Sequence, residues 1–175
     1  MIKGYRRPDI NGLETDAELE LLYKTVQEYE ARTIVEIGTL FGLSAAVLAE
    51  AGGRKAKVTT IDNFAVQGSD TKPYFYKQVL PKYSNLYIIE ADSSTAVKTW
   101  DRGIIDFIFI DGNHYDDGIM MDCRDWLPKL RRGGLAAFHD YFNDQFPNVR
   151  KRVEEYTGGW KMIAQVDSLI IKQKS

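Results

Sequence analysis

The chain has 175 residues, a formal net charge of −2 and 44% hydrophobic residues. This length and composition can bury a core without disulfides or metals, so we expect one domain over residues 1–175. Charges of both signs are spread along the chain, which argues against binding to nucleic acid or to a membrane surface and favours a small-molecule partner. The single cysteine excludes an internal disulfide, and residues 1–4 lead into polar sequence without an apolar signal segment, so we expect a cytoplasmic protein.

The N-terminal part of the chain contains an irregular arm and then a helix. Residues 1–13 show no hydrophobic periodicity, so the arm is either disordered or folds as a flap over a ligand. Residues 15–18, TDAE, have the form of a capping box, and apolar residues follow at helical spacing. This pattern predicts one helix that runs to about residue 30.

The most informative stretch covers residues 33–51, TIVEIGTLFGLSAAVLAEA. A β-branched run ends at Glu36, and Gly38 and Gly42 precede a helical pattern, which predicts a strand, a tight turn and a helix. Glycines in such a turn let a ligand approach the backbone at the start of the helix. The spacing is neither the G-x-G-x-x-G of dinucleotide-binding turns nor that of a P-loop. An acidic strand end suits a ligand with a positive end, such as S-adenosylmethionine, better than a pyrophosphate.

The remaining elements alternate between strands and helices. Further strands are expected at residues 57–61, 86–90, 104–110 and 135–138. Residues 63–83 are less regular, with a short helix near Pro73 whose aromatic residues 74–76 belong either to the core or to a substrate wall. The helix after residue 114 should bury Cys123.

The C-terminal part of the chain supplies the last strands. Gly133 and Gly134 are expected to end the preceding helix and to start the strand at residues 135–138. A short helix is expected around residues 149–156. Alternating residues 160–166 and 168–172 predict an antiparallel hairpin that turns near Asp167.

Together these elements predict an α/β, doubly wound, Rossmann-like fold with a mostly parallel sheet and a C-terminal antiparallel hairpin. Ligands of such sheets bind outside the carboxyl ends of the strands, at the topological switch point. A polar residue stands at every expected end of the five parallel strands, namely Glu36, Asp62, Asp92, Asp111 and the pair His139-Asp140. Any one of them could simply cap a helix, but all of them together favour a binding site.

At this point the sequence resembles class I S-adenosylmethionine-dependent methyltransferases, from about residue 11 to residue 172. The likeness is to small bacterial members whose pattern includes VEIG…G-S, an acidic second strand end, D-S after strand three, F-I-D-G-x-H-x-Y, D…W-L-P-x-L-x-x-G-G and H-D-Y. In this chain the motifs stand at residues 35–44, Asp62, Asp92-Ser93, residues 109–115, Asp122, residues 126–130, Gly133-Gly134 and residues 139–141.

The resemblance implies a methyl-donor site at the first three strand ends. Its residues are Glu36, Gly38, Gly42, Ser44, Asp62, Asp92 and Ser93. The glycines would let the turn lie against the methionine part of the donor, with Glu36 balancing the positive charge at its amino end. Asp62 would accept the ribose hydroxyls, and Asp92 would receive the adenine amino group. Structural alternatives stay open, since Asp62 could be a solvated strand end and Asp92 a plain helix N-cap.

A second resemblance concerns the metal-dependent catechol-type and caffeoyl-CoA-type O-methyltransferases, which hold a divalent cation after strands four and five. This chain is similar, with Asp111, His139 and Asp140 in those positions. Carboxylates favour Mg²⁺ and an imidazole widens the choice toward Mn²⁺, Fe²⁺ or Zn²⁺, so Mg or Mn is expected. His114 occupies the position of the lysine that acts as base in those enzymes. The alternatives are edge residues that hold no metal and a structural His114.

These features predict an S-adenosylmethionine-dependent methyltransferase that acts on the hydroxyl of a small molecule, with His114 and Asp111 as catalytic residues. Two rival interpretations remain. One is an NAD-dependent oxidoreductase on the same topology, which the missing G-x-G-x-x-G weakens. The other is a non-catalytic S-adenosylmethionine-binding partner protein. The sequence specifies neither the acceptor nor the oligomeric state.

Overall fold

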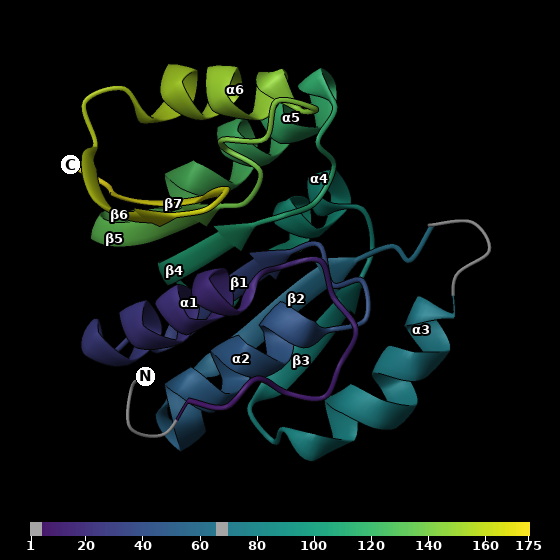
Figure 1. The fold of residues 1–175 in the computed structure, drawn as a ribbon. Coiled ribbons are helices and arrows are strands. Elements are labelled where there is room, and N and C mark those ends of the chain that lie inside the picture. Colours follow the sequence, from purple (N-terminus) through teal and green to yellow (C-terminus); the bar gives the residue numbers. More distant parts are fainter. Residues whose placement is uncertain (1–4, 66–69) are drawn as a thin grey trace.

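The structure is a computed structural model that describes residues 5–65 and 70–175. Residues 1–4 of the expected arm and residues 66–69 of the irregular segment lie outside these ranges. The strands are β1 Thr33–Ile37, β2 Lys57–Asp62, β3 Leu86–Glu90, β4 Ile105–Ile110, β5 Leu130–Phe138, β6 Lys161–Val166 and β7 Leu169–Gln173. They form one sheet in the order β3-β2-β1-β4-β5-β7-β6 (Figure 1).

The pairing of the strands confirms the expected fold class. β3, β2, β1, β4 and β5 run parallel to one another, whereas β7 is antiparallel to both β5 and β6. The chain winds outward from β1 to β3 and then returns to the other side of β1 with β4. The switch point therefore lies between β1 and β4, where the connections leave toward opposite sides.

Helices cover both faces of the sheet (Figure 1). They are α1 Asp16–Glu28, α2 Leu43–Gly52, α3 Thr71–Tyr74, α4 Ser93–Ala96, α5 Asp116–Trp126 and α6 Pro147–Thr157. Residues of α1 and α2 and the segment after α3 pack on one face, and residues of α4, α5 and α6 pack on the other. None of the helices in the described ranges is long and apolar enough to cross a membrane.

The first helix begins where the capping box predicts. The Thr15 hydroxyl accepts the Glu18 N–H at 3.2 Å, and the Glu18 carboxylate accepts the Thr15 N–H at 2.9 Å. Such a cap stabilises a helix by about 1 kcal/mol. Leu19, Leu22 and Val26 are buried against the sheet. The cap therefore fixes where α1 starts and which of its faces meets the core.

Two expectations along the chain are corrected by the structure. β5 begins at Leu130, so Gly133 and Gly134 lie inside the strand instead of ending a helix. α5 ends before Pro128, whose ring cannot continue the helix. Gly133 has φ +70°, which lets β5 bulge where its pairing with β4 shifts register. The glycines thus serve the strand and not the end of the helix.

The other open points concern the aromatic cluster and the cysteine. Cys123 is fully buried, as expected. Phe75 is also fully buried, and it belongs to a π-helical turn, Phe75–Val79, that continues α3. Tyr76 is 37% exposed at the surface. Phe75 therefore belongs to the core and Tyr74 packs against it, whereas Tyr76 lies at the surface. None of the three lines the cavity described below.

Candidate active site

A cavity of about 670 Å³ opens at the carboxyl ends of the parallel strands, at the switch point. Its wall comes from the ends of β1 to β4 and from residues 11–14 of the N-terminal arm. The expected site residues in this wall are Gly38, Ser44, Asp62, Asp92, Ser93, Asp111 and His114. The fold thus gathers residues that lie up to 76 positions apart in the chain, from Gly38 to His114, around one space.

The two glycines of the β1–α2 turn are needed for close packing of the chain. Gly38 has φ +95°, and a Cβ there would lie 2.1 Å from the carbonyl oxygen of Asp111. Gly42 has φ +91°, and its Cβ would lie 2.6 Å from the ring of Phe75. Any larger side chain would therefore push β1 away from β4, or α2 away from the segment after α3. Of the two, only Gly38 also lines the cavity.

Asp62 holds the turn that follows β1. One of its oxygens accepts the N–H groups of Thr39 at 2.8 Å and Leu40 at 3.0 Å, and the other accepts the N–H of Phe64 at 2.7 Å. Leu40 and Phe64 have positive φ, which costs a non-glycine residue about 1 kcal/mol or more. Bonds to a carboxylate offset this strain. A carboxylate has about four acceptor positions, so Asp62 can still accept a hydroxyl from the cavity.

The third strand end places Asp92 and Ser93 in the cavity wall. Asp92 stands at the N-cap position of α4 but makes no capping bond, because its side chain accepts the amide of Asn63 at 2.6 Å. The Ser93 hydroxyl donates to Asp122 of α5. Asp122 is 3% exposed, and burial raises the pKa of its carboxyl to about 6. Asp122 also lines the cavity. The motif that resembles the methyltransferases includes this residue, but nothing in the sequence assigns it a role.

Glu36 lies beneath the cavity instead of in its wall. Its side chain is fully buried and accepts the hydroxyl of Thr60 at 2.6 Å. Burial raises the pKa of Glu36 to about 8, so the carboxyl is mostly neutral at pH 7. The expected role, balancing positive charge at one end of a ligand, would need an ionised side chain with access to the cavity. In the structure Glu36 does not line the cavity.

The second group of expected residues meets at the ends of β4 and β5. Ligand atoms of Asp111, His114, His139 and Asp140 all lie within 4.8 Å of one another. His114 Nε2 is 2.8 Å from Asp140 Oδ2 and 3.3 Å from Asp111 Oδ1. His139 Nδ1 is 3.2 Å from the same Asp111 oxygen and 3.3 Å from the same Asp140 oxygen. We call these four residues the charged cluster.

The charges of the charged cluster shift one another's proton affinities. Burial acts to lower the pKa of His114, but hydrogen bonds to Asp111 and Asp140 outweigh it and raise the pKa to about 9. Burial opposes the shift at His139 too, yet its carboxylate neighbours raise its pKa. The pKa of Asp140 is lowered despite its burial, because both imidazoles bond to it. Asp140 also has φ +55°, a strained conformation of the kind that gathers at functional sites.

Three residues lie around the charged cluster although nothing in the sequence predicts that they belong to the site: Phe146, Glu14 and Glu18. The ring of Phe146 stacks on His114 with the ring centres 4.6 Å apart. Glu14 of the N-terminal arm is 7% exposed and lines the cavity, and burial and then Asp111 raise its pKa. Glu18, known from the sequence only as a capping residue, lies 3.2 Å from His139 Nε2. Hydrogen bonds from His139 and from neighbouring donors outweigh burial and lower its pKa to about 2.

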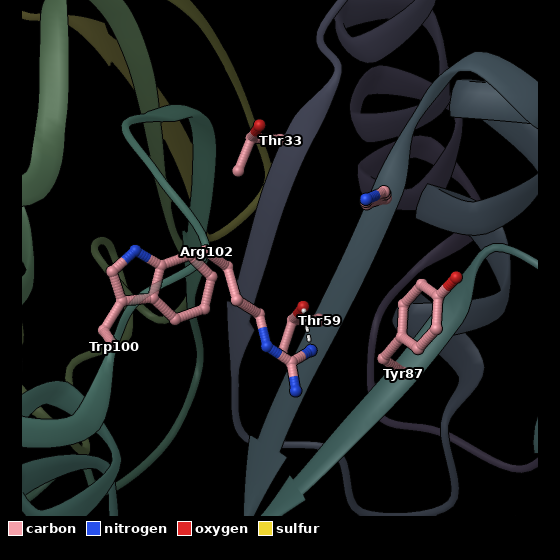
Figure 2. A pocket seen from close by; sticks show the side chains of 6 residues that line it. Thr33, Thr59, Tyr87, Trp100 and Arg102 are labelled. Atoms are coloured by element: carbon pink, nitrogen blue, oxygen red, sulfur yellow. Dashed lines mark hydrogen bonds between the residues drawn. The ribbon is translucent and has the colours of Figure 1, made fainter.

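A smaller hollow of about 350 Å³ lies on the sheet face near the start of β1, β2 and β3 (Figure 2). Its lining includes Lys57, Tyr87 and Arg102. Arg102 donates to the hydroxyl of Thr59 at 3.1 Å and lies 5.9 Å from the ring centre of Tyr87. α4 has only one turn, so this part of the sheet face remains open. None of the expected site residues lines this hollow.

The open parallel sheet with a cavity at its switch point places the chain in the class of doubly wound ligand-binding α/β proteins. A family profile described as a methyltransferase domain matches residues 35–141, more than half of the chain. The chain belongs to this methyltransferase family. The matched range starts in β1 and ends just after the charged cluster, so it includes both groups of site residues.

A curated relative and several solved structures are also similar to this chain. The uncharacterized protein y4gI of Sinorhizobium fredii is 22% identical in an alignment of 126 positions that covers 66% of this chain and 14% of the length of that relative. Cofactor-bound Rv0187 from MTB is 16% identical with a TM-score of 0.75, over 94% of this chain and 83% of that one.

Two solved O-methyltransferases carry a bound ligand. One, from Bacillus cereus in complex with SAH, is 19% identical with a TM-score of 0.67, over 96% of this chain and 84% of that one. TomG from Streptomyces achromogenes, in complex with SAM, is 18% identical with a TM-score of 0.68, over 93% of this chain and 82% of that one. At these identities the likeness is one of fold.

Proposed function

We propose that this chain transfers the methyl group of S-adenosylmethionine to a hydroxyl oxygen of a small-molecule acceptor, with a divalent metal ion held beside the donor. One observation carries the proposal. Asp111 and His114 belong both to the wall of the cavity and to the charged cluster, so a donor in the cavity would lie directly beside the groups that can prepare a hydroxyl. The ligands named for the B. cereus enzyme and TomG, SAH and SAM, are consistent with this donor.

The donor would occupy the part of the cavity along β1, β2 and β3. Asp62 has acceptor positions left for ribose hydroxyls, and Asp92 and Ser93 stand one strand further out, where an adenine would follow a ribose. Gly38 and Ser44 would face the methionine part of the donor. This placement directs the sulfonium toward the end of β4. The methyl group would then point at an oxygen held about 3 Å away, the geometry that an in-line transfer needs.

The charged cluster fits a divalent cation. It offers carboxylate and imidazole atoms within 4.8 Å of one another, the donor set that suits Mg²⁺ or Mn²⁺ and also admits Fe²⁺ or Zn²⁺. Asp111, His139 and Asp140 would hold the ion. A bound divalent ion supplies positive charge that lowers the pKa of a nearby hydroxyl and fixes its position.

His114 would accept the proton of the acceptor hydroxyl at Nε2. The carboxylates of Asp111 and Asp140 alone keep this ring protonated, but a cation between them would oppose that effect and favour the neutral ring. Phe146 stacked on the ring limits its rotation. Positioned bases of this kind accelerate proton transfer by roughly 10²- to 10⁴-fold.

Calorimetry with the purified chain tests the proposal. S-adenosylmethionine and S-adenosylhomocysteine should bind with micromolar-range affinity, whereas NAD should bind more weakly, because the β1–α2 turn lacks the phosphate-binding glycine pattern. Tighter binding of NAD than of S-adenosylmethionine would overturn the assignment of the donor. Acceptor hydroxyls can then be screened by the release of S-adenosylhomocysteine.

A further inference from the structure

Glu18 is a buried carboxylate next to the charged cluster. Its side chain is 2% exposed, and its Oε2 lies 3.2 Å from His139 Nε2, across 121 residues of chain. His139 itself is 8% exposed. A carboxylate this deeply buried is costly unless its oxygens are well bonded. The contact with His139 therefore compensates part of the cost of burying the Glu18 carboxylate.

Three further donors fix the orientation of the Glu18 carboxylate. Oε1 accepts the N–H of Ser168 at 3.0 Å and its hydroxyl at 2.7 Å. Oε2 accepts the N–H of Thr15 at 2.9 Å. Ser168 lies in the turn between β6 and β7, and Thr15 caps α1. Glu18 is thus clamped from two sides with one oxygen directed at His139.

The two ring nitrogens of His139 face different surroundings. Among the carboxylates of the described residues, Nε2 lies within hydrogen-bond reach of Glu18, whereas Nδ1 points at Asp111 and Asp140, at 3.2 and 3.3 Å. When one ring nitrogen donates its N–H to a carboxylate, the other keeps a lone pair for a metal ion. The clamped Glu18 therefore selects which of the two nitrogens can act as ligand.

We propose that Glu18 is the positioning residue of the metal site: it holds His139 as the Nε2–H form, so that the Nδ1 lone pair points at a divalent ion between Asp111 and Asp140. This inference rests on the metal part of the proposed function and adds a residue to it. Glu18 itself does not line the cavity. Its effect is exerted through the orientation and tautomer of one ligand.

The test compares Glu18→Gln with Glu28→Gln, the same change at an exposed carboxylate of the same helix, as a matched control. Glutamine keeps the shape of the side chain but loses the charge. The control leaves Glu18 and its hydrogen-bond partners unchanged. After treatment with a chelator, Mn²⁺ is titrated by calorimetry into the wild type and both variants. Glu18→Gln should weaken Mn²⁺ binding by about 10- to 100-fold, the usual effect of losing such a partner. Glu28→Gln should stay within about threefold of the wild type.

Separate outcomes identify which idea fails. Equal Mn²⁺ affinity in the wild type and Glu18→Gln, or an equal loss in both variants, overturns the role of Glu18 while the metal and donor assignments stand. A wild type that binds no Mn²⁺ at millimolar concentration overturns both the metal site and Glu18. S-adenosylhomocysteine affinity, measured in the same samples, reports on the donor site alone and should be unchanged in Glu18→Gln.

Nitrogen NMR of the wild type supplies a readout that does not depend on a variant of Glu18. The sequence contains two histidines, so a His114→Asn sample assigns both imidazoles. In the Zn²⁺-loaded protein, His139 should carry its proton on Nε2 and the metal on Nδ1. A proton on Nδ1 would contradict the inference whatever the binding data show.

Discussion

The candidate site has two halves that are built in different ways: the cavity wall at the first three strand ends, and the charged cluster, of which Asp111 and His114 line the cavity and His139 and Asp140 do not. In the donor half, at the ends of β1 to β3, Asp62 is held by backbone N–H groups of residues 39, 40 and 64. In the cluster half, at the ends of β4 and β5, Asp111 and Asp140 are held by the side chains of His114 and His139. Backbone donors stay in place when a neighbouring side chain is substituted. In the charged cluster, by contrast, loss of any one side chain leaves its partners without a hydrogen-bond partner or counter-charge.

This difference predicts how the halves respond to substitution. A change in the donor half should affect donor binding and local stability and leave metal binding intact. A change in the charged cluster should affect metal binding and turnover and leave donor binding intact. A variant in one half that changed ligand binding in the other half would show that the two halves are coupled more tightly than their contacts in the structure indicate.

The largest expected effect concerns His114 of the cluster half. His114→Ala should reduce turnover by roughly 10²- to 10⁴-fold at saturating donor and metal, because the hydroxyl proton loses its acceptor. Donor affinity should stay nearly unchanged. His114→Lys should restore part of the rate at higher pH, since an amine at this position can also act as a base. Near-normal turnover of the alanine variant would mean that His114 is structural.

The next largest effect concerns metal binding. Asp140→Ala should weaken binding of Mn²⁺ by more than about 100-fold, because it removes a ligand and not merely the partner of one. S-adenosylhomocysteine affinity should remain within about threefold. Asp144→Ala, an exposed aspartate nearby, is the control. Elemental analysis and titration after chelation measure both quantities, and retained Mn²⁺ binding would place the ion elsewhere.

A smaller effect is expected in the donor half. Asp62→Ala should cost about 1.5 to 3 kcal/mol of S-adenosylhomocysteine binding, the scale of hydrogen bonds to a charged group. It should also lower the free energy of unfolding, because three backbone N–H groups lose their acceptor. Mn²⁺ affinity should not change. Asp101→Ala, exposed and away from the cavity, provides the comparison. Unaltered donor affinity would show that Asp62 only braces the turn.

The last prediction concerns Asp122 of α5, a carboxylate in the cavity wall that accepts the Ser93 hydroxyl but, within the described residues, no backbone N–H outside its helix. Burial raises the pKa of Asp122 from 3.8 to about 6, so the folded state binds a proton more tightly than the unfolded state. The cost of burying the charge is therefore absent below pH 4 and complete above about pH 6. Asp122→Asn should raise the free energy of unfolding by about 2 kcal/mol at pH 8 and by almost nothing at pH 4.

Urea unfolding between pH 4 and pH 8 measures this dependence. Asp125→Asn on the same helix is the control, since Asp125 pairs with Arg124 and its pKa is lowered instead. A gain for Asp122→Asn that does not vary with pH would mean that its carboxylate is not strained by burial. It would also weaken the view that backbone donors distinguish Asp62 from its neighbours.

The sequence predicts the order of the elements and the fold class correctly, because both depend on short local patterns. The capping box at Thr15, the β-branched runs and the glycine turn each act over a few residues, and each appears where it was expected. The sequence does not predict the start of β5, because a glycine such as Gly133 can either end a helix or allow a bulge in a strand. Only the register against β4 decides between them.

The site was predictable to the extent that strand ends meet at one edge of a parallel sheet. That rule places Asp62, Asp111 and His114 in the cavity wall. The rule does not specify which way a side chain points. The position of Glu36 below the cavity therefore could not be predicted from it. Contacts between distant segments, such as that of Glu18 with His139, cannot be recognised from local patterns, because α1 meets the residue after β5 only in the folded chain.

The bonds from Ser168 to Glu18 also have a consequence for how the protein is made on the ribosome. Chains emerge from their N-terminus, and folding begins before synthesis is complete. β1, β2, β3 and β4, with the turn that Asp62 holds, are available long before the β6–β7 turn has been translated. The clamp on Glu18 closes only when residue 168 arrives. A nascent chain can therefore form the turn that Asp62 holds before the carboxylate of Glu18 is clamped beside His139.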